Sequence, residues 1–172
     1  MLIWKKTFMG VAAAATMTVI PAATLSSLPA SAAEVAPCFI TGDAWFDGAG
    51  MTNATAASTG QVRLFLDCPG VGTAAGHWNL YAAISSPAAS CAVDNAGSGT
   101  FTGGGGPETV VGGSFSFQRG GPALHAEGTL RTTGATYAFS AEVILQYAAT
   151  CFLQNTTYSQ IAAGSTAVLR AD

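Results

Sequence analysis

Hydrophobic and polar residues alternate with a period of two over most of the chain after residue 34. In the stretch 61–67, valine and leucine at even positions alternate with mostly polar residues at odd positions. Successive side chains of a strand point to opposite faces, so this alternation predicts strands with one buried and one wet face, which is typical of antiparallel sheets. Eight runs are predicted as strands: residues 39–46, 61–67, 77–85, 91–102, 109–119, 124–131, 136–147 and 158–169.

The segments between these runs are mostly short and rich in glycine, proline, asparagine and threonine. Residues 103–107 read Gly-Gly-Gly-Gly-Pro and are predicted as a flexible turn, residues 132–135 as a hairpin loop, and residues 51–59 as an exposed loop. Consecutive strands joined by short loops usually pair with each other. The sequence therefore predicts an all-β fold, a single antiparallel domain of about eight strands. An up-and-down barrel is slightly favoured over a two-sheet sandwich.

The start of the chain does not follow this alternation and predicts a secretory signal peptide. Lys5 and Lys6 form a short cationic head, and the apolar run 8–23 follows them. The Ala-Ser-Ala segment at 30–32 has the small residues at the spacing that a signal peptidase reads. The alanine-, glycine- and threonine-rich composition resembles that of secreted proteins of high-GC Gram-positive bacteria.

Cleavage after Ala32 and cleavage after Ala33 fit this pattern equally well. We therefore expect a signal peptide at 1–33 and a secreted, extracellular β domain at 34–172. Cleavage removes both lysines, so four arginines and nine acidic residues remain, which is a formal charge of −5. Nucleic acids and anionic membranes attract basic patches, so this charge argues against both as partners. No other stretch of the sequence is long and apolar enough to span a bilayer, so no membrane association is expected after cleavage.

Four cysteines in an oxidising compartment predict two disulfides. In an up-and-down topology, Cys38 at the start of the first strand and Cys68 at the end of the second lie at the same end of the sheet. Cys91 and Cys151 lie at the opposite end by the same reasoning. Because bridged cysteines need close Cα atoms, the topology predicts the pairs Cys38–Cys68 and Cys91–Cys151.

The polar face of the run 124–131 holds one candidate for chemistry. If the loop 132–135 closes a hairpin, His125 lies opposite Glu142, and Glu127 shares its face. A histidine between two carboxylates has a raised pKa and is a candidate acid/base catalyst or weak metal ligand. The alternative interpretation is a solvated ion pair across the strands. Since His77 is the only other histidine, the sequence predicts no metal site.

Aromatic residues give a second set of candidates, for ligand binding. Asp43 and Asp47 lie close in sequence to Trp45, and carboxylates beside an aromatic ring are compatible with a sugar site; the alternative is a strand end followed by a turn. Trp78 is a candidate ligand platform, although its position on the apolar face of the run 77–85 favours the core. The Gly-x-Ser-x-Gly motif of serine hydrolases is absent, and no cofactor motif is present.

These observations lead to three functional hypotheses. The first is a non-catalytic extracellular binding or surface-interaction module, because a crosslinked β scaffold is predicted without a recognisable reaction centre. The second is a carrier of a small apolar ligand in a barrel or sandwich cavity. The third is a hydrolase that uses the face of His125, Glu127 and Glu142. The partner expected from the sequence is an unknown extracellular molecule or a small ligand.

Overall fold

The computed structural model describes residues 37–48, 50–70, 72–91, 94–146 and 156–172. They belong to one compact unit, Glu34–Asp172. The predicted signal peptide, with its cleavage at Ala32 or Ala33, lies outside the described residues and stays a prediction. In the described part of the chain all regular structure is β-strand. No helix that could cross a bilayer occurs there.

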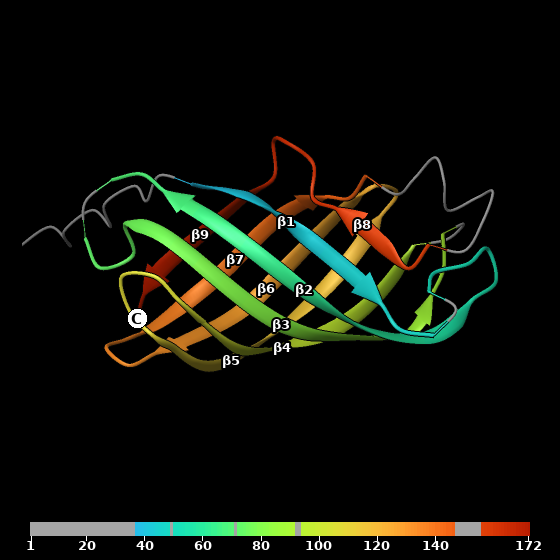
Figure 1. Ribbon diagram of the computed structural model, residues 1–172, viewed down its shortest axis with the longest axis horizontal. Helices are drawn as coiled ribbons and strands as arrows, with labels where there is room; N and C mark the ends of the chain where they lie inside the picture. Colours follow the sequence, from blue (N-terminus) through green and yellow to red (C-terminus); the bar gives the residue numbers. More distant parts are fainter. Residues whose placement is uncertain (1–36, 49, 71, 92–93, 147–155) are drawn as a thin grey trace, which may run out of the picture. The chain divides into compact units, whose positions relative to one another are not determined.

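The strands form a closed antiparallel barrel (Figure 1). They are β1 (Cys38–Phe46), β2 (Ala56–Cys68), β3 (Gly76–Ala89), β4 (Asn95–Gly105), β5 (Val110–Gly120), β6 (Ala123–Thr132), β7 (Thr136–Ile144), β8 (Tyr158–Gln160) and β9 (Thr166–Ala171). The sheet follows the order β2-β3-β4-β5-β6-β7-β9-β1, and β1 also pairs with β2, which closes the ring. The prediction of a barrel rather than a sandwich is confirmed.

The prediction of one continuous last strand over 158–169 is wrong. Both β8 and β9 pair with β1, β9 near its start and β8 near its end, and they are separated at 161–165. The buried Ser165 holds this break together, because its hydroxyl donates to the carbonyl of Ala162 and accepts from the amide of Ile144, both at 2.9 Å. Gly164 has a φ of +92°, a conformation that favours glycine.

The glycine run at 103–107 also differs from its prediction as a turn. Gly103, Gly104 and Gly105 belong to β4 and pair with β3, so β4 starts and ends later than the predicted run 91–102. A Cβ atom at Gly104 would lie 2.1 Å from the carbonyl oxygen of Asn79. Glycine therefore lets β4 approach β3 closely here, and the first three residues of the predicted turn are part of the barrel wall, while Gly106 and Pro107 lie between β4 and β5.

The barrel interior differs between its two ends. At the disulfide end, where β1 begins and β2 ends, large buried side chains fill the centre. Trp78 and Tyr137 pack edge to face with ring centroids 5.8 Å apart, and the Trp78 indole donates to the carbonyl of Ala74 at 2.9 Å. At the hollow end, where β1 ends and β2 begins, small residues such as Ala126 face inward around a cavity.

The predicted disulfide between Cys38 and Cys68 is present, and both residues are buried. It joins the start of β1 to the end of β2 across 30 residues of sequence. Such a crosslink stabilises the fold by about 3–4 kcal/mol through the restricted unfolded chain. Cys91 is buried at the hollow end, but its predicted partner Cys151 lies outside the described residues, so that pair stays a prediction.

Candidate functional site

The outer surface of β1, β2, β3 and β8 carries several large aromatic side chains. We define the aromatic face as five exposed aromatic residues together with the partly buried Asp43 and Arg63. The five aromatic residues are Phe39, Trp45, Phe65, Tyr81 and Tyr158. The strand register gathers them, because Asp43 lies opposite Arg63 and Arg63 lies opposite Tyr81. Trp45 lies opposite Tyr158 on the other edge of β1. Three consecutive strands and β8, which follows β1 by more than 100 residues, thus build one surface.

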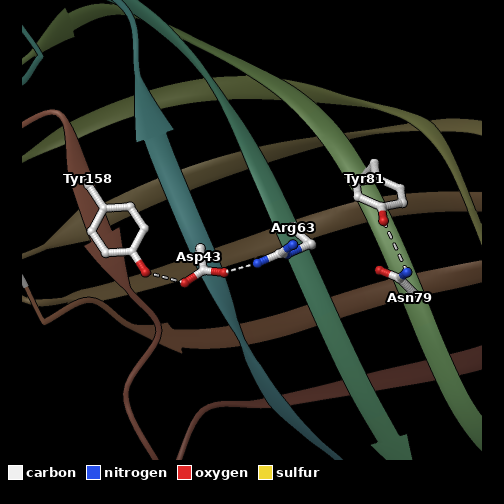
Figure 2. Close-up of polar contacts among 5 residues, drawn as sticks. All are labelled: Asp43, Arg63, Asn79, Tyr81 and Tyr158. Carbon is white, nitrogen blue, oxygen red and sulfur yellow. Dashed lines mark hydrogen bonds and ion pairs between the residues drawn. The ribbon is translucent and has the colours of Figure 1, made fainter.

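An ordered polar row crosses the aromatic face (Figure 2). The Arg63 guanidinium donates from Nη2 to Oδ2 of Asp43 at 2.6 Å, and the Tyr158 hydroxyl donates to Oδ1 of the same carboxylate. The bond from Tyr158, followed by that from Arg63, lowers the pKa of Asp43 below its ordinary value of 3.8. The same carboxylate raises the pKa of Tyr158. Asp43 is therefore an ionised anchor at neutral pH and holds both partners in place.

Arg63 also orders the aromatic rings around it. Its guanidinium carbon lies 5.4 Å from the ring centroid of Trp45 and 5.2 Å from that of Phe65, which is the range of cation–π contact. On the far side, the rings of Trp45 and Tyr158 are tilted with centroids 5.8 Å apart. Trp45 remains 39% exposed and Tyr158 44% exposed. These rings are held in position and still reach solvent.

Two shallow depressions lie in this surface. One, of about 420 Å³, lies between Trp45 and Tyr81, with Gln61 and the small residue Ala83 among its lining residues. The other, of about 550 Å³, is lined by residues that include Phe39, Phe65 and Asn79. In Figure 2, Asn79 and Tyr81 lie together on β3, where the Asn79 amide donates to the Tyr81 hydroxyl at 3.2 Å. Aromatic and amide groups therefore border both depressions.

The second cluster of candidates lies on β6 and β7. His125 lies opposite Glu142 and Glu127 opposite Ser140, as the hairpin predicted. Nδ1 of His125 is 2.5 Å from Oε1 of Glu142, and Nε2 is 3.1 Å from Oε1 of Glu127. Contact with Glu142, followed by that with Glu127, raises the pKa of His125 above its ordinary value of 6.5.

This environment favours the protonated imidazolium of His125. Both ring nitrogens then carry a proton, so neither has a lone pair for accepting a proton or binding a metal. All three side chains are well exposed, with 44% of the His125 side chain and 67% of that of Glu127 accessible. In the described part of the chain, no group of three or more histidine, cysteine, aspartate or glutamate side chains is placed to hold a metal ion. The arrangement is that of a solvated ion-pair cluster.

The structure separates the three aromatic-site candidates of the sequence. Asp43 and Trp45 lie on the aromatic face, whereas Trp78 is only 2% exposed and packs in the core beneath it. Asp47 accepts a hydrogen bond from the Thr59 hydroxyl at 2.6 Å, close to the end of β1. It therefore secures the strand end, which was the alternative interpretation of this residue.

Sequence reasoning missed most of the aromatic face. The sequence did not identify four of its residues as candidates: Arg63, Phe65, Tyr81 and Tyr158. A signal was present, because Phe65 and Tyr81 are large aromatic residues on the wet sides of two alternating runs. Comparison of the sequence with protein-family models and curated proteins, and of the structure with solved structures, gives no match. Function is therefore inferred from the geometry of these surfaces and of the barrel interior.

Proposed function

We propose that this protein is an extracellular, non-catalytic binding protein whose aromatic face binds a carbohydrate chain. The observation that carries this proposal is the gathering of exposed aromatic rings around the ordered Arg63–Asp43 pair. A contiguous exposed apolar patch rimmed by polar groups marks an interaction site in soluble proteins. The rings are held in place before any ligand arrives, so binding loses little side-chain entropy.

The chemistry of the face supports a carbohydrate ligand. The faces of aromatic rings are electron-rich and attract the C–H groups on the flat side of a sugar ring. Gln61 is exposed beside one depression and offers an amide donor and acceptor to hydroxyl groups, and the Tyr81 hydroxyl borders the same depression. A neutral, polyhydroxylated chain also suits an acidic protein, because it requires no basic patch. Two depressions on one face suit a chain of several sugar rings rather than a single one.

The state of the titratable groups supports binding without catalysis. A glycosidase needs one carboxylic acid with a raised pKa that donates a proton. The pKa of Asp43 is lowered by Tyr158 and Arg63, which is the opposite shift. The pKa of His125 is raised, and both of its nitrogens are engaged by carboxylates, so the hydrolase hypothesis lacks a general base at this position.

Co-sedimentation of the purified protein with insoluble cellulose, chitin, xylan and peptidoglycan tests this proposal. We expect binding to at least one of these polysaccharides. Loss of one stacking ring, in Trp45→Ala or Tyr81→Ala, is expected to weaken binding about tenfold, equivalent to about 1.4 kcal/mol. Val111→Ala is the matched control, because Val111 is an exposed apolar residue on β5, outside the aromatic face.

Two results would overturn this proposal. One is a wild-type protein that binds none of the four polysaccharides. The other is binding by the double variant Trp45→Ala/Tyr81→Ala that equals wild type, since this would place the ligand elsewhere on the surface. Circular dichroism of each variant shows whether the barrel is retained.

A further inference from the structure

A cavity of about 80 Å³ lies inside the hollow end of the barrel. The surface that faces the cavity is almost wholly apolar and comes from strands around the barrel, although Asn95 and the buried Arg119 are also among the lining residues. Lining residues include Ala44, Val62, Ile84, Phe117, Ala126 and Ala141. The cavity is separate from the aromatic face, because strand side chains alternate between the interior and the outer surface. It therefore represents a second place where a ligand can bind.

The cavity has a clear origin in the sequence. Ala126 on β6 and Ala141 on β7 lie directly opposite each other, and both are buried and line the cavity. On β4, a Cβ atom at Gly97 would lie 2.3 Å from the ring of Phe117 on the neighbouring strand. The Phe117 ring thus occupies the space over a glycine. The small side chains of Ala126 and Ala141 leave part of the interior unfilled.

An apolar lining determines what the cavity can hold. A buried water needs two to four polar partners, and an apolar cavity offers too few of them, so such cavities stay dry. An engineered apolar cavity of about 150 Å³ binds benzene or xenon. This cavity is smaller, at about 80 Å³, and therefore suits a narrower ligand, such as the end of a hydrocarbon chain.

A polar boundary lies on one side of the cavity. Ser58, Thr59, Ser85 and Ser86 line both the cavity and a surface depression of about 500 Å³ on β2, β3 and β4. Thr59 and Ser85 are exposed, and Ser86 is buried. Ser58 and Ser86 lie opposite each other on the inward-facing side of β2 and β3, so their hydroxyls border the apolar interior, whereas Thr59 and Ser85 face solvent. A ligand with an apolar end and a polar end matches this change of environment.

We propose that the hollow end binds a short-chain amphiphile. Its hydrocarbon tail occupies the apolar cavity, and its polar head group lies at the hydroxyls of Ser58 and Ser86. The driving force is transfer of methylene groups from water into an apolar site, which is worth about 0.8 kcal/mol each. This site does not depend on carbohydrate binding at the aromatic face, so either one can fail without the other.

Binding of the n-alkanols from butanol to decanol, measured by isothermal titration calorimetry, tests this site. We expect affinity to rise about fourfold per added methylene, the factor that corresponds to its transfer free energy. The rise should stop within the series, at the chain length that outgrows the cavity. Ala141→Leu and Ala126→Leu each place a larger side chain into the cavity and are expected to weaken the best alkanol at least about tenfold.

A matched control comes from the same strand. Ala138 on β7 is exposed and points outward, so Ala138→Leu should leave alkanol binding unchanged. Trp45→Ala should also leave it unchanged, which separates this site from the aromatic face. If leucine at 126 or 141 prevents folding, Ala126→Val adds less volume and still narrows the cavity. The site is refuted if wild type binds no alkanol, or if a folded cavity variant binds as tightly as wild type.

Discussion

The two ends of this barrel share one wall of strands but are built inside in different ways. At the disulfide end, Trp78, Tyr137 and Leu130 fill the centre and are buried almost completely. At the hollow end, Ala126 and Ala141 take the corresponding inward positions further along β6 and β7, and a cavity of about 80 Å³ remains. Interior close packing accounts for most of the stability of a small domain. The comparison therefore indicates that one end stabilises the barrel while the other retains room for a ligand.

The difference has a consequence for where substitutions are tolerated. A void means that its lining atoms have already lost part of their dispersion contacts. Removing atoms there costs less than at a closely packed site, and adding atoms costs less too. At the disulfide end the interior is filled, so both removal and addition of atoms disturb closely packed side chains. Matched substitutions at the two ends therefore measure the difference directly.

The largest effect is expected from truncation of a leucine on β6. Leu130 is fully buried at the disulfide end, and Leu124 is partly buried beside the cavity. Leu130→Ala should lower the free energy of unfolding by about 3–5 kcal/mol, because it removes a buried side chain and opens a void. Leu124→Ala should cost less than half of this. Urea unfolding followed by tryptophan fluorescence measures both, and equal losses would contradict the proposed difference between the ends.

A smaller effect on the free energy of unfolding is expected when a buried alanine is enlarged, and its size should differ between the two ends of the barrel. Ala167 on β9 is 1% exposed and lies opposite Cys38 on one side and Ala141 on the other, and it does not itself line the cavity. Ala167→Val should therefore destabilise the barrel by about 1–3 kcal/mol through overpacking. Ala126→Val extends into the cavity, so its effect should lie within about 1 kcal/mol of zero. Thermal unfolding followed by calorimetry distinguishes the two, and a loss at Ala126 as large as that at Ala167 would show that no usable space exists there.

Much of the barrel follows from local patterns in the sequence. The alternation of polar and apolar residues located the main strands. The short loop at 132–135 fixed the β6–β7 register, which placed His125 opposite Glu142 correctly. The disulfide between Cys38 and Cys68 followed from the up-and-down order alone. These successes share a cause, because each depends on neighbouring strands joined by a direct connection.

The candidate site was harder to predict, because its residues come from segments without such a connection. Tyr158 reaches Asp43 only because β8 pairs with the end of β1, more than 100 residues earlier in the chain. The break at 161–165 is likewise set by the tertiary contacts of Ser165 and leaves little trace in the hydrophobic pattern. The cavity depends on small residues from different strands meeting in one layer. The period-two pattern of a strand indicates which face of the sheet a side chain occupies. It does not indicate at which height along the barrel axis that side chain lies.

The smallest expected effect is on the pH dependence of stability. It distinguishes the two histidines, which lie near opposite ends of the barrel. His125 lies two residues from the start of β6, close to the hollow end, and contacts two carboxylates. His77 on β3 lies at the disulfide end, 3.3 Å from Asp67, with 87% of its side chain exposed. Glu142 and Glu127 raise the pKa of His125 in the folded protein above its ordinary value of 6.5. Protonation of His125 is thus linked to folding.

The sign of this linkage follows from the direction of the shift. A folded-state pKa above the unfolded value gives a stabilising contribution that is complete below about pH 6.5 and is lost as the pH rises through the folded pKa. Because these side chains are well exposed, the loss should not exceed about 1 kcal/mol. Urea unfolding of wild type at a series of pH values from about 6 to 9 measures it. His125→Gln should abolish this part of the pH dependence, whereas His77→Gln should retain it. If His77→Gln removed as much of the dependence as His125→Gln, the linkage would not be specific to the hollow end.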